Sequence, residues 1–165
     1  MTAKGTLILG IDPGSRITGY GLVRKFGSQL LYESCGLIKP DTQLDFVDRL
    51  DFIYTGMCDV IGKYRPQEVA IEDVFVSINP RSALKLGHAR GVLMLAGRHN
   101  RLPVSEYAAR TIKQSVAGYG NAEKSQIQQA VRAILKLSGT PSEDAADGLA
   151  VAICHASHLD FSPKE

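Results

Sequence analysis

The sequence predicts an α/β fold in which helices flank a mixed β-sheet. Three strand-like segments come first, and later strands alternate with segments of helical periodicity. The most apolar segment, residues 6–12, has hydrophobic side chains at nearly every position, as expected of a central strand covered on both faces. The order of these segments therefore predicts a sheet of five strands and a chain that ends in helices.

Turn residues set the limits of the predicted elements. Pro13, Gly14 and Ser15 end the first strand, and residues 26–29 form a turn between the second and third strands. Apolar side chains then recur at helical spacing from Phe46 to Tyr64. The predicted strands cover residues 6–12, 19–23, 30–38, 69–72 and 102–105. The predicted helices cover residues 46–64, 82–98, 107–116, 122–137 and 142–158.

Length and composition favour one domain over residues 1–165, with a short disordered tail at about 159–165. A chain of 165 residues can bury about 70% of the surface that it exposes when unfolded, so it needs no disulfide framework. Apolar stretches such as 148–154 fall short of the roughly 20 residues of a membrane span, and the start does not resemble a secretory signal. Three scattered cysteines are typical of reduced thiols. We therefore expect a cytoplasmic protein with no membrane segment.

Positive charge is concentrated in the middle of the chain. The formal net charge is only +2, which taken alone argues against a nucleic-acid partner. Residues 81–136, however, contain ten Lys and Arg against two acids, a net charge of +8, while the flanking segments carry −2 and −4. Such asymmetry is typical of a surface that binds a phosphate backbone, although basic helix faces exposed to solvent produce it too.

Four acidic residues occupy positions that a purely structural role explains poorly. Asp12 and Glu72 each end an apolar strand, where a buried charge is costly unless it is paired or bound to a metal. Asp144 and Asp147 lie one helical turn apart in an otherwise small and apolar helix. The alternative for this last pair is ordinary stabilisation of a helix N-terminus, with Ser142 as the cap.

If the four carboxylates converge, they predict a metal-dependent phosphodiesterase. Oxygen-only ligands select hard ions such as Mg²⁺, with Mn²⁺ as a substitute, over zinc or copper. Two such ions about 3.5–4 Å apart can hold a phosphodiester between an attacking water and the leaving oxygen. We therefore expect two Mg²⁺ ions in the active site, with all four acids as ligands and Asp144 either a direct ligand or a residue that orients water.

Several collinear motifs, between about residues 6 and 157, resemble the RuvC family of crossover junction endodeoxyribonucleases, the Holliday junction resolvases. They are Gly-Ile-Asp-Pro-Gly-Ser-Arg-Ile-Thr-Gly-Tyr-Gly at 10–21, Ile-Glu-Asp-Val-Phe at 71–75, Ser-Ala-Leu-Lys-Leu-Gly-His-Ala-Arg-Gly at 82–91, Glu-Tyr-Ala-Ala-Arg at 106–110, Ile-Lys-Gln at 112–114, Ala-Glu-Lys-Ser-Gln at 122–126 and Asp-Ala-Ala-Asp-Gly-Leu-Ala at 144–150. The resemblance implies an RNase H-like fold in which the first and fourth strands are neighbours. Each of the four acids matches a catalytic acid of the family.

The resemblance also implies residues that bind DNA. Phe75 matches an aromatic residue that stacks on bases at the opened crossover, and Lys113 and Lys124 match basic residues near the scissile phosphate. Arg81 and Lys85 lie one turn apart on a predicted helix and are interpreted as contacts to the DNA backbone. Without the resemblance, Phe75 would read as a core residue and the lysines as surface residues.

The expected partners and reaction follow from the same resemblance. A homodimer would make two symmetric incisions across a four-way DNA junction in recombination and repair, leaving 5′-phosphate and 3′-hydroxyl ends. The RuvA–RuvB branch-migration complex is the expected protein partner, and the bacterial cytoplasm the expected location. Two other functions stay open: an RNase H-like nuclease acting on RNA or an RNA–DNA hybrid, and a non-catalytic junction-binding protein.

Some residues depart from the family pattern or lie outside its motifs. Asp73 follows Glu72 where an uncharged residue is common, and strand alternation should direct it away from the metals. Gly148 stands where Ala is usual and is expected to loosen the helix, whereas Gly87 and Gly91 favour close packing of their helix against the sheet or against a dimer partner. His155 lies beside a cysteine without a second pair of ligands, so we interpret it as a helix-end surface residue.

Replacement of Phe75 tests the stacking role directly. Phe75→Ala should weaken junction cleavage while the protein stays folded, because the stack that it removes contributes about 1–3 kcal/mol per base. Junction cleavage and thermal melting should be measured on the same preparation. An unfolded variant would instead identify Phe75 as a core residue.

Overall fold

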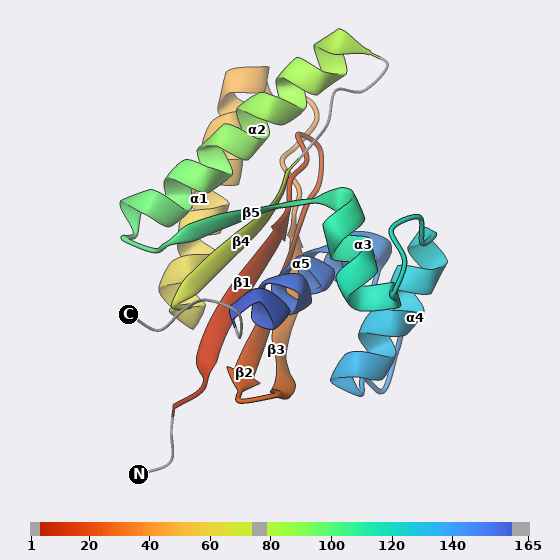
Figure 1. The fold of residues 1–165 in the computed structure, drawn as a ribbon. Coiled ribbons are helices and arrows are strands. Elements are labelled where there is room, and N and C mark those ends of the chain that lie inside the picture. The colour runs from red at the N-terminus through yellow and green to blue at the C-terminus, as the bar shows by residue number, and fades with distance from the viewer. Residues whose placement is uncertain (1–3, 74–78, 160–165) are drawn as a thin grey trace.

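A five-stranded mixed sheet lies between two layers of helices, as the computed structural model shows for residues 4–73 and 79–159 (Figure 1). The strand order is β3-β2-β1-β4-β5. This arrangement confirms the α/β fold with a mixed five-stranded sheet. The elements are β1 (Thr6–Asp12), β2 (Thr18–Phe26), β3 (Gln29–Ile38), α1 (Phe46–Tyr64), β4 (Glu68–Asp73), α2 (Pro80–His99), β5 (Val104–Ala108), α3 (Ala109–Ala117), α4 (Lys124–Leu135) and α5 (Glu143–Leu159).

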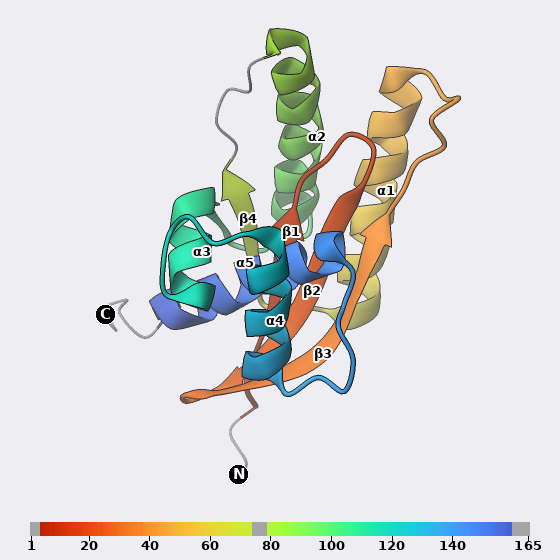
Figure 2. The same ribbon diagram turned by 90° about the vertical axis from the view of Figure 1, so that its right-hand side faces the viewer.

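The central position of β1 explains its continuous apolar sequence. It pairs antiparallel with β2 on one side and parallel with β4 on the other. Its side chains alternate between two cores: Leu7 and Leu9 pack in the core with α1 and α2, whereas Ile8 packs in the core with α3, α4 and α5. Figure 2 shows these two helical layers on opposite faces of the sheet. Both faces of β1 are therefore covered.

Helix α5 approaches the sheet so closely that glycines are required where the two meet. A Cβ added at Gly10 would overlap the backbone of Gly148 and Ala152, and one added at Gly19 would overlap the carbonyl of Asp144. On the helix, a Cβ at Gly148 would lie 2.6 Å from the Cα of Tyr20. These glycines let the helix backbone rest on the backbones of β1 and β2. The distance between α5 and the sheet is therefore fixed in the first half of the helix.

The structure corrects two interpretations of glycine. Gly148 does not loosen α5, because any side chain at this position would collide with β2. Gly87 and Gly91 are not explained by close packing within the chain, since a Cβ at either position meets no described atom within 4 Å. The spacing of glycines in the sequence does not show which of them lie against a neighbouring backbone and which face open space.

The boundary between β5 and α3 was also predicted wrongly. Tyr107 and Ala108 belong to β5, where Tyr107 pairs with Glu72 in parallel register, and α3 begins at Ala109. The motif at 106–110 has alanines that favour a helix, but strand pairing with β4 outweighs that local propensity. Phe75 and residues 160–165, most of the expected tail, lie outside the described residues. None of the helices that the structure describes is long and apolar enough to cross a membrane.

His155 is buried, so its interpretation as a surface residue is wrong. Only 3% of it is exposed, and both ring nitrogens have partners. Nδ1 lies 2.7 Å from the Tyr107 hydroxyl, and Nε2 lies 3.3 Å from a carboxylate oxygen of Glu68. Burial lowers the pKa of His155, and burial raises that of Tyr107, so a neutral imidazole accepts from the phenol and donates to Glu68. This network joins α5 to β4 and β5.

Loss of this network should destabilise the protein in a pH-dependent way. His155→Leu leaves the Tyr107 hydroxyl without its partner and should cost about 1–3 kcal/mol at pH 7.5. The folded-state pKa of His155 lies below its unfolded value, so the wild type loses this stability as the pH falls below about 6.5. The deficit of the variant should therefore shrink between pH 7.5 and pH 5, measured by denaturant unfolding. His99→Leu, which removes an exposed histidine in contact with a different tyrosine, Tyr54, is the control, and a deficit independent of pH would contradict the assignment.

Candidate active site

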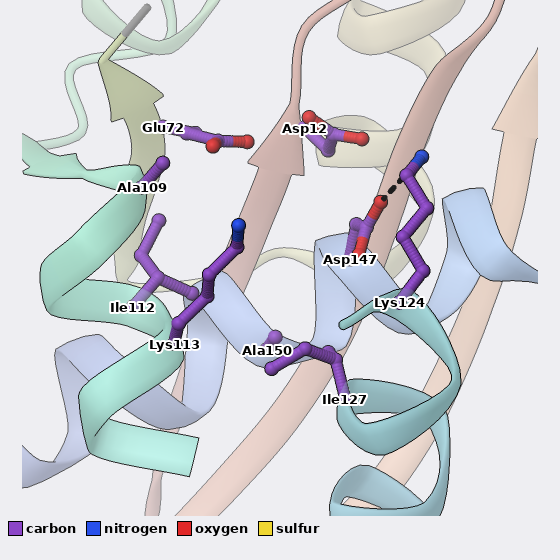
Figure 3. A pocket seen from close by; sticks show the side chains of 9 residues that line it. All are labelled: Asp12, Glu72, Ala109, Ile112, Lys113, Lys124, Ile127, Asp147 and Ala150. Atoms are coloured by element: carbon purple, nitrogen blue, oxygen red, sulfur yellow. Dashed lines mark ion pairs between the residues drawn. The ribbon is translucent and has the colours of Figure 1, made fainter. Parts of the chain in front are cut away.

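Two acids meet because β1 and β4 are parallel neighbours. Ile11 of β1 stands opposite Ile71 of β4, so the next residues of the two strands, Asp12 and Glu72, lie side by side at the same end of the sheet. The two side chains are close enough for the Glu72 carboxyl group to raise the pKa of Asp12. Figure 3 shows both side chains at the rim of one pocket. The strand-end positions that marked these residues in the sequence therefore become one site.

The first turns of α5 bring the other two acids to the same place. Ser142 caps the helix by accepting from the backbone N–H of Ala145 at 3.4 Å. Asp144 and Asp147 follow one turn apart, and carboxylate oxygens of Asp12, Asp144 and Asp147 all lie within 4.8 Å of one another. Among the described residues, this is the one group of His, Cys, Asp and Glu side chains close enough together to hold a metal ion. The structure thus brings together the four acids selected from the sequence.

Half-burial makes this concentration of negative charge unfavourable. Burial, followed by the contact with Glu72 and the charges of neighbouring acids, raises the pKa of Asp12 to about 9. Burial also raises the pKa of Asp147 to about 6, against the opposing effect of Lys124. Both shifts mean that the ionised cluster lacks sufficient counter-charge from the protein alone. A bound cation would supply it, and the oxygen-only donor set fits a hard divalent ion.

Two lysines face the acids from α3 and α4. Lys113 and Lys124 line the pocket, whose volume is about 220 Å³, together with the acids Asp12, Glu72 and Asp147. Lys124 Nζ lies 3.8 Å from Asp147 and also 3.8 Å from Glu143. A capping box at the start of α4, between Glu123 and Gln126, holds this lysine near the pocket. The structure therefore places both predicted lysines beside the carboxylates.

The floor of the pocket is apolar. In Figure 3, Ile127 of α4 and Ala150 of α5 lie below the charged groups, and Ala109 and Ile112 of α3 line one side. Apolar walls keep water from screening the charges above them, so the attraction between a bound anion and the lysines is stronger than in open solvent. The pocket has room for metal ions together with a phosphate group between the acids and the lysines.

The other predicted DNA contacts lie outside this pocket. Arg81 is exposed in the first turn of α2, and Lys85 is half-buried one turn further along. Neither lines the pocket, so the structure separates them from the acids. Phe75, between Glu72 and α2 in the chain, falls outside the described residues.

Arg90 has a supporting role that was not recognised in the sequence. Its Nε donates to the carbonyl of Glu72 at 3.0 Å, and its guanidinium pairs with Asp73 at 3.5 Å and with Glu106. Asp73 thus points to the α2 side of the sheet, as strand alternation predicted. The sequence did contain a signal for Arg90. Asp73 ends β4 on the face covered by α2, and an acid there requires a cation from that helix.

Thr18 is a second supporting residue that was missed. It is fully buried, and its hydroxyl donates to the carbonyl of Gly14 at 2.9 Å. The backbone N–H of Gly14 in turn donates to the same hydroxyl oxygen at 3.3 Å. These contacts close the turn that follows Asp12. In the sequence, Thr18 had no feature beyond its place inside the motif.

Comparisons with known proteins identify the family of the chain. The sequence model of the family described as crossover junction endodeoxyribonuclease RuvC matches residues 8–155. The chain belongs to the RuvC family. Proteins named crossover junction endodeoxyribonuclease RuvC from Syntrophotalea carbinolica and Legionella pneumophila are 57% and 51% identical to it. The first alignment covers 90% of this chain and 92% of the relative, and the second covers 93% and 88%.

A solved RuvC structure has the same fold. T. thermophilus RuvC, in complex with a Holliday junction substrate, superimposes with a TM-score of 0.88 at 31% identity, covering 94% of this chain and 96% of that one. This match confirms the RuvC family and the RNase H-like arrangement that the motifs predicted. The correspondence extends over the elements that carry the acids, since β1, β4 and α5 all lie within or overlap the matched residues 8–155.

Replacing Asp12 with a side chain that cannot ionise should stabilise the metal-free protein. The raised pKa keeps Asp12 protonated in the fold at pH 8, while the unfolded chain has released that proton. Wild-type stability in chelator should therefore fall as the pH rises from 5 to 8, and Asp12→Asn should remove most of this fall, with a smaller part left by the raised pKa of Asp147. We expect a gain of at least about 1 kcal/mol at pH 8, equivalent to a rise in Tm of about 2–4 °C.

Thermal melting in chelator at pH 5 and pH 8 measures this effect. Asp51→Asn, which neutralises an exposed acid on α1, should leave the pH dependence unchanged. Equal stability of wild type and Asp12→Asn at pH 8 would show that the folded protein tolerates the ionised cluster without a cation.

Proposed function

We propose that this protein is a Holliday junction resolvase, an endonuclease that hydrolyses phosphodiester bonds in four-way DNA junctions. The observation that carries the proposal is the convergence of Asp12, Asp144 and Asp147 within 4.8 Å, beside Lys113 and Lys124 in one pocket. The choice of a four-way junction as the substrate rests on membership of the RuvC family and on the junction bound to the T. thermophilus relative.

The donor set of the pocket fits two Mg²⁺ ions. Asp12, Glu72, Asp144 and Asp147 would hold them, with Asp144 as a direct ligand or through an ordered water, and Mn²⁺ would substitute because it has the same preference for oxygen. When bound, such a pair activates an attacking water and stabilises the leaving oxygen of a phosphodiester. The raised pKa values of Asp12 and Asp147 support this assignment, since both acids gain a counter-charge from the ions.

The two lysines bind and orient the scissile phosphate. Lys113 and Lys124 come from different helices and approach the acids from opposite sides (Figure 3). Their charges offset the additional negative charge that develops on phosphorus-bound oxygens in the transition state, and the apolar floor strengthens this effect. Lys124 can exchange its long contact with Asp147 for a phosphate oxygen. Water adds to phosphorus as the bond to the 3′ oxygen breaks, which gives a 5′-phosphate and, after proton transfer, a 3′-hydroxyl.

A homodimer accounts best for resolution of a symmetric junction. Each resolution event needs cuts in two equivalent strands, and the described part of one chain carries one cluster of acids. Two chains related by a two-fold axis would present two such pockets to the two strands. We further infer that the protein acts in recombination and repair in the bacterial cytoplasm, on junctions moved by the RuvA–RuvB complex. The family resemblance supports these assignments.

A cleavage assay with three substrates tests the proposal. The purified protein should cut a four-way junction in the presence of Mg²⁺ or Mn²⁺, cut a linear duplex and an RNA–DNA hybrid much less, and cut nothing in chelator. The nicked products should be sealed by DNA ligase, as 5′-phosphate and 3′-hydroxyl ends require. Equal cutting of linear duplex and junction would contradict the proposal. Preference for the hybrid would favour an RNase H-type activity.

An active-site variant separates catalysis from binding. Asp12→Asn should bind the junction and lose more than about 100-fold in cleavage, since loss of a partner outside the metal ligands already costs about 10–100-fold. Asp51→Asn serves again as the control. Junction binding without cleavage by the wild type would identify a non-catalytic junction-binding protein.

A further inference from the structure

We propose that the first turns of α1 and α2 form a second phosphate-binding site, which contacts the backbone of a DNA arm away from the scissile bond. This inference rests on the proposed action on junction DNA. Its centre is the ring of Phe46, the first residue of α1. Arg49 and Lys85 place positive charges over this ring, and His88 stands beside it. We call these four residues the Phe46 cluster.

Two helices contribute to the cluster. The guanidinium carbon of Arg49 lies 5.2 Å from the centre of the Phe46 ring, and Nζ of Lys85 lies 5.6 Å from it. The His88 ring packs edge-on against Phe46, with centroids 5.8 Å apart and planes at 88°. A ring that attracts both cations restricts two long side chains that would otherwise move freely in solvent. The cluster is therefore an ordered pair of positive charges.

These charges lack an anionic partner within the described chain. In the ranges 4–73 and 79–159, no carboxylate lies within ion-pair distance of Arg49 or Lys85. The neighbouring acids of α1, Asp45 and Asp48, are exposed and do not pair with Arg49. The Nε atom of Arg49 is buried and has no hydrogen-bond partner. Because this nitrogen is enclosed, an oxygen-rich anion would bind Arg49 through its other guanidinium nitrogens.

The position of the cluster indicates which anion this is. Helices α1 and α2 both begin at the end of the sheet where β1 and β4 end, as Figure 2 shows. Asp12 and Glu72 mark that same end, but the lysines of the pocket belong to the other helical layer. The chain from Glu72 to Pro80 connects the pocket to α2. A nucleic-acid strand that leaves the pocket across this end of the sheet would run toward the start of α1 and α2, so we assign a backbone phosphodiester as the ligand of the Phe46 cluster.

The cluster also gives a role to one predicted DNA contact that the pocket did not include. Lys85 was expected to contact the backbone from its helix spacing alone, and the Phe46 ring explains how it is held. Arg49 and Phe46 lie on another helix and had no assigned role. A phosphate bound here reads no base, so the site would position a junction arm without sequence preference.

Salt dependence of junction binding tests the site. Binding should be measured by fluorescence anisotropy with a labelled four-way junction in chelator, so that no cleavage occurs, between about 50 and 200 mM salt. Arg49→Gln and Lys85→Gln should each weaken binding and reduce the slope of log K against log salt by about 1, as expected when one phosphate contact is lost. Arg49→Lys, which keeps the charge, should retain most of the slope.

Lys63→Gln provides a matched control on the same helix. Its Nζ lies 5.0 Å from the ring centre of Tyr64, so it forms the same kind of cation–aromatic pair at the far end of α1, about 21 Å from Arg49 along the helix axis. This variant should leave both affinity and slope unchanged. Melting curves should show all variants folded at the temperature of the assay.

The outcomes separate this proposal from the function that it assumes. An unchanged slope for folded Arg49→Gln, with tight binding by the wild type, would overturn the second site alone. Failure of the wild type to bind the junction would overturn the resolvase assignment and this site with it. Competition by inorganic phosphate at low millimolar concentration would identify a free-anion site, and so would also overturn the DNA-backbone assignment.

Discussion

Three carboxylates held within 4.8 Å of one another are the constraint on which the rest of the structure depends. Two unit charges at 4 Å repel by about 4 kcal/mol at an effective dielectric constant of 20, and half-burial prevents water from reducing this cost further. The protein therefore needs a rigid frame to keep the acids together. That frame is the parallel pairing of β1 with β4 and the close contact of α5 with β1 and β2.

The charge of the surroundings follows from the same constraint. Lys113 and Lys124 stand at the edge of the acids instead of among them, so they can offset charge on a bound phosphate without replacing a cation in the centre. Arg90 acts on the opposite face of β4, where it pairs with Asp73 and holds the carbonyl of Glu72. The small net charge of the chain is thus the sum of an acidic cluster and the basic residues that surround it.

The sequence allowed prediction of the sheet, the order of elements and the residues that converge at its end. The acids were selected from local patterns: an unbroken apolar strand, an acid at its last position, and a pair of acids one turn apart. Their convergence was predicted from the family resemblance, which implies that the first and fourth strands are neighbours. Contacts across the fold were not predictable in this way. His155 sits near the end of a helix in sequence, and only the approach of β4 and β5 buries it. The start of α3 was misplaced because Tyr107 pairs with β4 as part of a strand, although the residues around it favour a helix.

The glycines beneath α5 have a consequence for how sequence variation in this chain should be interpreted. Gly10, Gly19 and Gly148 touch no ligand, yet each sets the distance between two backbones. A methyl group at any of them would push the helix outward and carry Asp144 and Asp147 away from Asp12, with no change in the chemical groups present. Loss of activity on substitution of these glycines would therefore report a changed distance between the acids. It would not be evidence that glycine takes part in the chemistry.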